Sequence, residues 1–126
     1  MPIKLPLSAN YNSLMNSDVP LSDTIYSLTI AATTDTTLVV PTASDLGGTN
    51  TATPNYLIAR IRHTPNNNVW FANNGTAAVP AGSSFALTTS ELLDNNVCEY
   101  KVKSGDTLHF FTAASNVVIS VAFYWL

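Results

Sequence analysis

Short runs in which apolar and polar residues alternate cover most of the chain, and turn-forming residues separate them. Alternation with a period of two is typical of strands that bury one face, and Gly, Pro, Asn and Asp favour the turns between strands. The pattern predicts strands near 23–32, 36–40, 56–63, 69–72, 76–79, 83–87, 97–103, 107–112 and 117–126. We therefore predict an all-β fold, an antiparallel β-sandwich of jelly-roll type with about eight strands, in one domain of residues 23–126.

The last run, residues 117–126, has no charge, Gly or Pro. One face would hold Val117, Ile119, Val121, Phe123 and Trp125, and the other Val118, Ser120, Ala122, Tyr124 and Leu126. Since neither face suits water, this strand must be central in its sheet or covered by another subunit. We expect a subunit interface formed by Val121, Phe123, Tyr124, Trp125 and Leu126.

Two tight turns predict hairpins between consecutive strands. The turn at 104–106 would set Val102 opposite Leu108, and Cys98 would then share the inward face with Val102. Asn74-Gly75, a strong signal for a short hairpin, would join the strands on either side of it.

Residues 1–22 are predicted to form an extended N-terminal arm, because three prolines and several Asn and Ser residues interrupt any regular pattern. The arm holds too many apolar side chains for a solvated tail. We expect it to lie on its own domain, on a neighbouring copy or on a partner. The candidate contact residues are Ile3, Leu5, Leu7, Tyr11 and Leu14.

Charged residues make up only 10% of the chain, and the formal net charge is −3. The five cations, which look scattered, are Lys4, Arg60, Arg62, Lys101 and Lys103. They are too few for binding to nucleic acid or to an anionic membrane. No apolar run reaches the roughly 18 residues of a transmembrane helix, and the first residues lack the apolar segment of a signal peptide. We therefore expect synthesis in the cytoplasm.

The residue types that could carry chemistry form no motif. Cys98 and His109 would lie on opposite faces of the sheet, so the thiol is interpreted as a small core residue. His63 and His109, even with Asp106, lack the spacing of a metal site and are interpreted as surface residues on outer sheet faces. We predict no catalytic residue, no metal and no cofactor, and so not an enzyme.

Two further groups could bind a partner. Arg60 and Arg62 share one strand face and could hold a carboxylate, although a solvated face is the simpler interpretation. Trp70, Tyr11 and Tyr56 could stack on a sugar, although packing in the core or at an interface is the simpler interpretation.

The C-terminal half resembles a known family. Residues 79–87 (Val-Pro-Ala-Gly-Ser-Ser-Phe-Ala-Leu), residues 100–110 (Tyr-Lys-Val-Lys-Ser-Gly-Asp-Thr-Leu-His-Phe) and the closing apolar strand resemble small jelly-roll decoration (cement) proteins of tailed bacteriophages. The resemblance implies a virion structural protein that binds the outer capsid lattice and stabilises the head. It also implies a trimer, the major capsid protein as partner and no catalytic residues. The alternatives are a tail-fibre or receptor-binding jelly roll that binds carbohydrate and, remotely, a small hydrolase.

Overall fold

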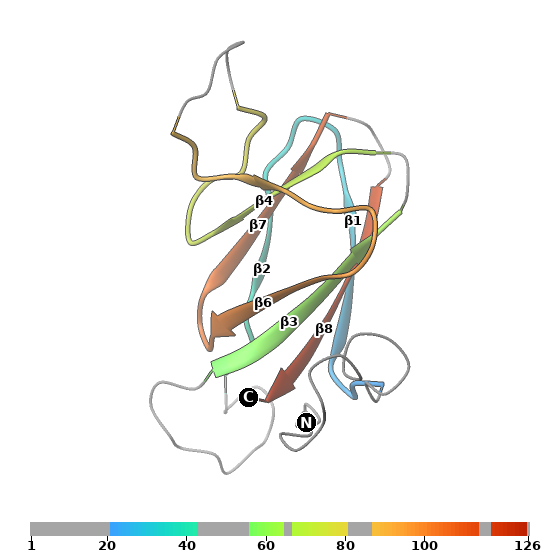
Figure 1. Ribbon diagram of the computed structural model, residues 1–126, viewed down its shortest axis with the longest axis vertical. Coiled ribbons are helices and arrows are strands. Elements are labelled where there is room, and N and C mark those ends of the chain that lie inside the picture. The colour runs from blue at the N-terminus through green and yellow to red at the C-terminus, as the bar shows by residue number, and fades with distance from the viewer. Residues whose placement is uncertain (1–20, 43–55, 65–66, 81–86, 114–116, 126) are drawn as a thin grey trace.

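Eight strands and no helix make up the regular structure of the described residues, which are 21–42, 56–64, 67–80, 87–113 and 117–125 of a computed structural model (Figure 1). The strands are β1 (Ile25–Ile30), β2 (Thr36–Val39), β3 (Tyr56–His63), β4 (Val69–Asn73), β5 (Glu91–Leu92), β6 (Cys98–Lys103), β7 (Thr107–Thr112) and β8 (Val117–Trp125). The all-β prediction is confirmed.

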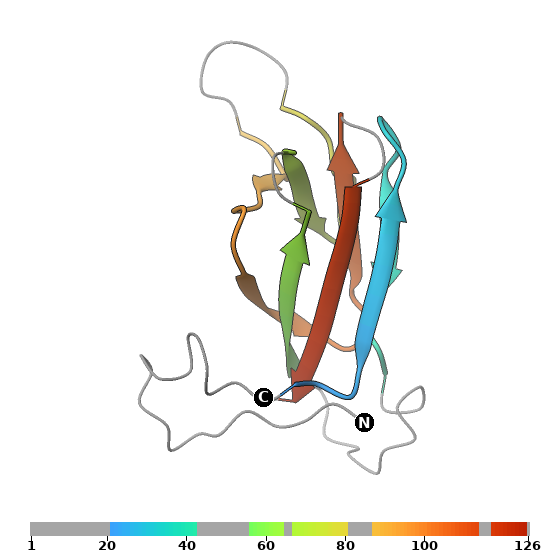
Figure 2. The same cartoon turned by 90° about the vertical axis from the view of Figure 1, so that its right-hand side faces the viewer.

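The strands form two four-stranded antiparallel sheets. Sheet A has the order β1-β8-β3-β6, and sheet B has the order β2-β7-β4-β5. Figure 2 shows β3, β8 and β1 side by side in one layer. The pairing is nested: β1 pairs with β8, β2 with β7, β3 with β6 and β4 with β5. This arrangement confirms the predicted antiparallel sandwich.

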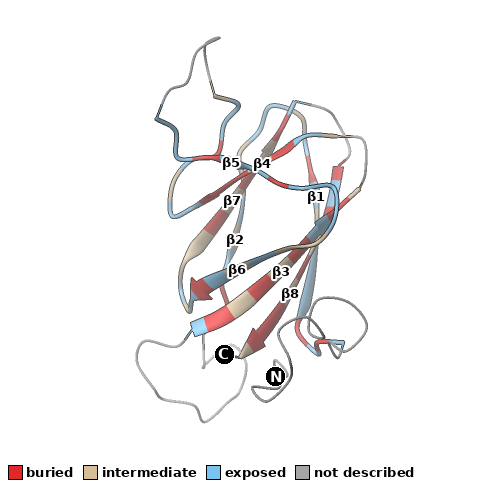
Figure 3. Ribbon diagram, in the orientation of Figure 1, coloured by how far each residue is buried: buried red, intermediate tan, exposed pale blue. Residues whose placement is uncertain are grey.

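The core lies between the sheets and is built from alternate residues of each strand. Along β3 the buried residues are Leu57, Ala59, Ile61 and His63, and Figure 3 shows the resulting alternation of colours. Aromatic rings join the two sheets: the ring centroid of Phe71 in sheet B lies 4.9 Å from that of Tyr100 in sheet A. The same ring lies 5.4 Å from that of its sheet neighbour Phe110.

Strand β8 is central in sheet A, between β1 and β3, which is one of the two arrangements that its apolar faces allow. Val121 and Phe123 have no exposed surface and fill the domain's own core. Trp125 is half-buried against that core. Tyr124 is only 2% exposed although the register places it on the outer face, and Leu126 lies outside the described residues. An interface built by β8 would therefore use its outer face, not Val121 and Phe123.

Residues 1–20 of the N-terminal arm lie outside the described residues, and with them all five candidate contact residues. Ser22, which the prediction assigned to the arm, is buried beside β8. Its hydroxyl donates a hydrogen bond of 2.6 Å to the Phe123 carbonyl and accepts one of 3.0 Å from the Thr24 N–H. Residue 22 is thus anchored to the sandwich.

The predicted hairpin at 104–106 is wrong, although a turn forms there. The turn carries the chain from sheet A to sheet B, so β6 pairs with β3 and β7 pairs with β2 and β4. Val102 and Leu108 are therefore not strand partners, yet both are buried because they face the same core from opposite sheets. The prediction of faces holds because it depends on the period of two alone.

The hairpin predicted at Asn74-Gly75 is also wrong. Residues 76–80 form no strand, and β4 pairs instead with β7 and with the two-residue strand β5. The reason lies in the backbone donors after the turn. The Ala77 N–H donates to the Asp35 carboxylate at 3.2 Å, and the Ala78 N–H donates to the Ser90 hydroxyl at 3.1 Å.

A carboxylate joins the turn after β4 to the turn between β6 and β7. Asp106 accepts hydrogen bonds from the Asn74 side chain at 2.9 Å, the Lys103 N–H at 3.0 Å and the Asn73 side chain at 3.3 Å. The side-chain oxygen Oδ1 of Asn74 in turn accepts a hydrogen bond from the Thr107 N–H at 2.8 Å. Desolvation raises the pKa of Asp106, but these hydrogen bonds and the Lys103 charge outweigh it, so the pKa lies below its ordinary value.

This carboxylate should make stability depend on pH in acid. Because the pKa of Asp106 is lower in the folded state, its contribution is present above the ordinary pKa of about 3.9 and is lost as the pH falls through the folded-state value. We expect Asp106→Asn to be less stable than the wild type at neutral pH and to lose less stability on acidification. Urea unfolding at a series of pH values measures both. An acid loss as steep in the variant as in the wild type would contradict this role.

Candidate functional site: a basic sheet face

Four of the five Lys and Arg residues of the chain lie on the outer face of sheet A. Arg60 and Arg62 are on β3, and Lys101 and Lys103 are on the neighbouring strand β6. They point outward because the residues between them on both strands point into the core. The prediction that the cations are scattered is therefore wrong: strand pairing brings two distant pairs together. We call these four cations, with Glu99 and Tyr56, the basic face.

One of the four cations is neutralised within the sheet. Arg60 and Glu99 are directly opposed in the register, and Arg60 Nε lies 3.5 Å from Glu99 Oε1. The Arg60 side chain is 12% exposed, and its Nε makes no hydrogen bond. A buried charge needs a partner, so Glu99 holds Arg60 in place.

The remaining cations are exposed. In the described part of the chain, no carboxylate lies within ion-pair distance of Arg62, Lys101 or Lys103. Glu99 is the one acidic residue on the strands of sheet A, so four cations face one carboxylate, a formal surplus of three positive charges. This surplus lies on a chain whose net charge is −3. The basic face can therefore attract an anionic partner.

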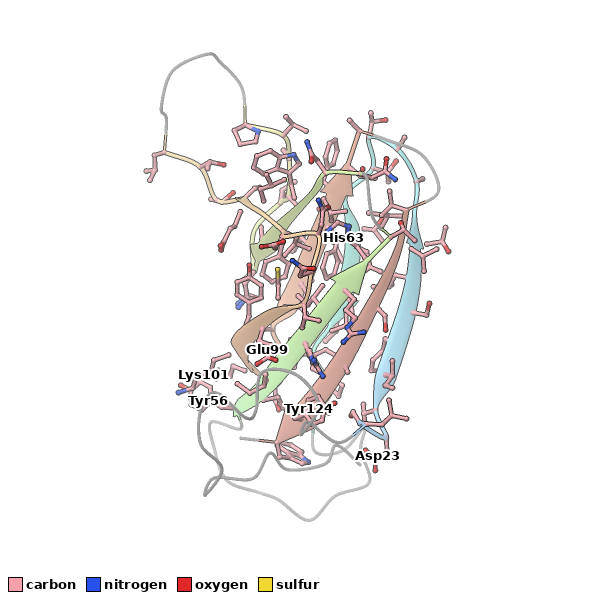
Figure 4. All side chains as sticks on the ribbon, turned by 45° about the vertical axis from the view of Figure 1, so that its right-hand side comes forward. Asp23, Tyr56, His63, Glu99, Lys101 and Tyr124 are labelled. Atoms are coloured by element: carbon pink, nitrogen blue, oxygen red, sulfur yellow. The ribbon has the colours of Figure 1, made fainter. Side chains whose placement is uncertain are left out.

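The aromatic ring of Tyr56 contacts one of the exposed cations, Lys101. Lys101 Nζ lies 4.4 Å from the ring centroid of Tyr56, a distance at which a cation and a ring attract each other. Lys103 is opposite Tyr56 in the register. Figure 4 shows Tyr56 and Lys101 beside each other, with Glu99 further along β6. The ring leaves the ammonium group exposed and limits where it can point.

Cys98 and His109 are not brought together. Cys98 is on β6, and its Sγ accepts a hydrogen bond of 3.2 Å from the Asp94 N–H. His109 is on β7 in the other sheet. Tyr100 lies two residues from Cys98 on β6. Its burial, and next the charge of Glu91, raise the pKa of Tyr100 to about 12, so this phenol stays protonated at neutral pH.

The two histidines also lie apart from each other, and the interpretation of His63 as a surface residue is wrong. His63 points inward, is 9% exposed and contacts two backbone carbonyl groups. The alternation along β3 indicates that His63 is buried, since His63 lies two residues after the buried Ile61 and so faces the same side. Within the described ranges, no three His, Cys, Asp or Glu side chains gather as metal ligands would.

His109 ties β7 to the turn between β1 and β2. His109 Nδ1 lies 2.7 Å from Asp35 Oδ2, and Asp35 Oδ1 accepts the hydrogen bond from the Ala77 N–H. Both side chains are mostly buried. We expect Asp35→Ala and His109→Ala each to lower the free energy of unfolding by about 1–3 kcal/mol, since each leaves a polar partner unsatisfied. Urea unfolding of both variants and of the double variant measures the coupling, and additive losses would contradict a direct interaction.

The proposed sugar-stacking group is not assembled from its described members. Trp70 is half-buried on the outer face of sheet B, between Phe111 and Leu92 in the register, whereas Tyr56 is on sheet A. Tyr11 lies outside the described residues.

No protein-family model matches the chain, and comparisons with curated proteins and with solved structures give no match either. Among the described residues there is no helix long and apolar enough to cross a membrane.

Proposed function

We propose that the chain is a virion structural protein, a capsid decoration protein that binds the outer capsid lattice and stabilises the head. The observation that carries the proposal is the nested pairing of the eight strands, first with last through fourth with fifth, in two antiparallel sheets. Jelly rolls, among them viral capsid domains, are built as eight-stranded double sheets, so this arrangement supports the proposal. The sequence resemblance in the C-terminal half supports the same class.

The use of the reactive side chains favours binding over catalysis. Cys98, His63 and His109 each hold a neighbouring strand or loop through a structural hydrogen bond. Cys98 and His63 both contact the backbone of Asp94, and His109 lies on the other sheet. The basic face instead offers exposed charge on a regular sheet. We assign it the contact with the major capsid protein, and a trimer is part of the same proposal.

Quantitative mass spectrometry of purified particles tests this function. Heads and tails of the virus that encodes the chain are separated, and the amount of the chain is compared with that of the major capsid protein. A decoration protein should be in the head fraction at a copy number comparable with that of the shell subunits. A few copies in the tail fraction would favour a receptor-binding jelly roll, and absence from both fractions would overturn the proposal.

A further inference from the structure

We infer that the β6 edge of the basic face binds an extended acidic segment of a partner protein, which adds to sheet A as a further strand. The geometry of β6 and its charges carry this inference. Only the identity of the partner, the capsid protein, rests on the proposed function.

The backbone of β6 is open to such a strand. β6 is the last strand of sheet A and pairs with β3 alone. The Lys103 N–H and carbonyl both bond to Asp106, so they point away from β3. By the alternation of an antiparallel strand, the backbone groups of Lys101 and Glu99 point the same way. No described residue takes a hydrogen bond from them or gives one to them.

The charges select the partner. An added strand would lie beside Lys101 and Lys103, whose side chains are about 7 Å apart because they are two residues apart on one face. Carboxylates at alternate positions of an extended segment have the same spacing, so two of them can meet the two ammonium groups. Glu99 does not oppose this contact strongly because Arg60 neutralises it at 3.5 Å. Lys103 also acts on the carboxylate of Asp106, so Lys101 is the stronger of the two contacts.

Two other partners fit less well. The β6 strand of a second copy offers one carboxylate, Glu99, which Arg60 already neutralises, together with two more lysines, so it matches the basic face less well than a segment with carboxylates at alternate positions. Nucleic acid needs many neutralised phosphates, and a chain of pI about 5.0 with three exposed cations on this face offers few.

A peptide that alternates Asp with Thr probes the site directly. Fluorescence anisotropy should show binding that weakens as salt is raised. The same peptide with Asn in place of Asp should bind about tenfold more weakly or worse, because neutral side chains lose the charge contacts. N-methylation of the peptide backbone at every second residue, on the side that faces β6, should abolish binding, since it removes the hydrogen bonds of an added strand.

Matched protein variants separate local charge from net charge. Lys101→Gln with Lys103→Gln should weaken binding by about tenfold. Thr37→Glu with Val39→Glu changes the net charge by the same two units at exposed positions of β2 in sheet B and should leave binding unchanged. Thermal unfolding of the two double variants confirms that they fold. The inference would be overturned if the Asn peptide bound as tightly as the Asp peptide, or if both double variants weakened binding equally. Tighter binding to single-stranded DNA than to the acidic peptide would also overturn it.

Cosedimentation with purified heads distinguishes this inference from the proposed function. If the protein binds heads and the Lys101→Gln/Lys103→Gln variant binds them equally well, the inference fails while the function stands. If the protein binds the acidic peptide but not heads, the function fails while the acidic-strand site stands.

Discussion

Replacing Phe123 by alanine is expected to lower the free energy of unfolding by about 3–5 kcal/mol. Phe123 has no exposed surface, lies on the central strand β8 and faces Ala59 across the pair with β3. Its ring packs edge-to-face on Tyr26, with centroids 5.8 Å apart and planes at 76°. The small Ala59 leaves space that the Phe123 ring fills, so truncation leaves a cavity in the middle of sheet A.

Urea unfolding measures this loss, and a substitution on the same strand controls for it. Val118 is on the outer face of β8 and is 38% exposed, so Val118→Ala should change stability by about 0.5 kcal/mol or less. Native mass spectrometry of the same samples reports the oligomeric state. If Phe123→Ala dissociated an oligomer and left subunit stability unchanged, Phe123 would be an interface residue and not a core residue.

The faces of the strands could be predicted from the sequence because burial of one face imposes a period of two. This holds for β8, where Val117, Ile119, Val121 and Phe123 are all fully buried. It holds for β6, where Val102 is buried and the charged residues point outward. A local pattern is sufficient here, since each residue's neighbours on its own strand determine its face.

The strand partners could not be predicted, because a turn does not show whether the chain returns in the same sheet. The turn at 104–106 has hairpin residues, including Gly105 at a φ of 88°, yet it crosses between sheets. Asn74 adopts the left-handed conformation expected of a hairpin, at a φ of 58°. Its side chain, however, bonds to Asp106 and to Thr107, far along the chain. Long-range hydrogen bonds decide the pairing in both cases.

The basic face depends on which strands pair, so the pattern of each single strand does not reveal it. Arg60 and Arg62 share one parity on β3, and Lys101 and Lys103 share one parity on β6, which the sequence shows. That β3 and β6 are neighbours is a property of the nested strand order. A prediction that had paired the strands in this nested order before it placed the charges would have found this face.

Replacing His63 by alanine is expected to cause the second largest loss of stability, about 2–4 kcal/mol, from a cavity and from a lost hydrogen bond together. His63 Nε2 lies 2.8 Å from the Asp94 carbonyl oxygen, and Nδ1 lies 2.9 Å from that of Thr64. The ring thus ties the end of β3 to the loop that leads into β6. Its register partner is Ile119 in the core, so water has little access to replace it.

A second substitution separates the two contributions. His63→Phe keeps most of the ring volume but removes every N–H donor, so it should lose about 1–3 kcal/mol and leave a buried carbonyl without a donor. The difference between His63→Ala and His63→Phe then measures the cavity. Urea unfolding gives both values, with Arg62→Gln, an exposed neighbour on β3, as the control. If His63→Phe were as stable as the wild type, the hydrogen bond that the imidazole N–H donates to a backbone carbonyl group would contribute nothing. The loop before β6 would then be held by packing alone.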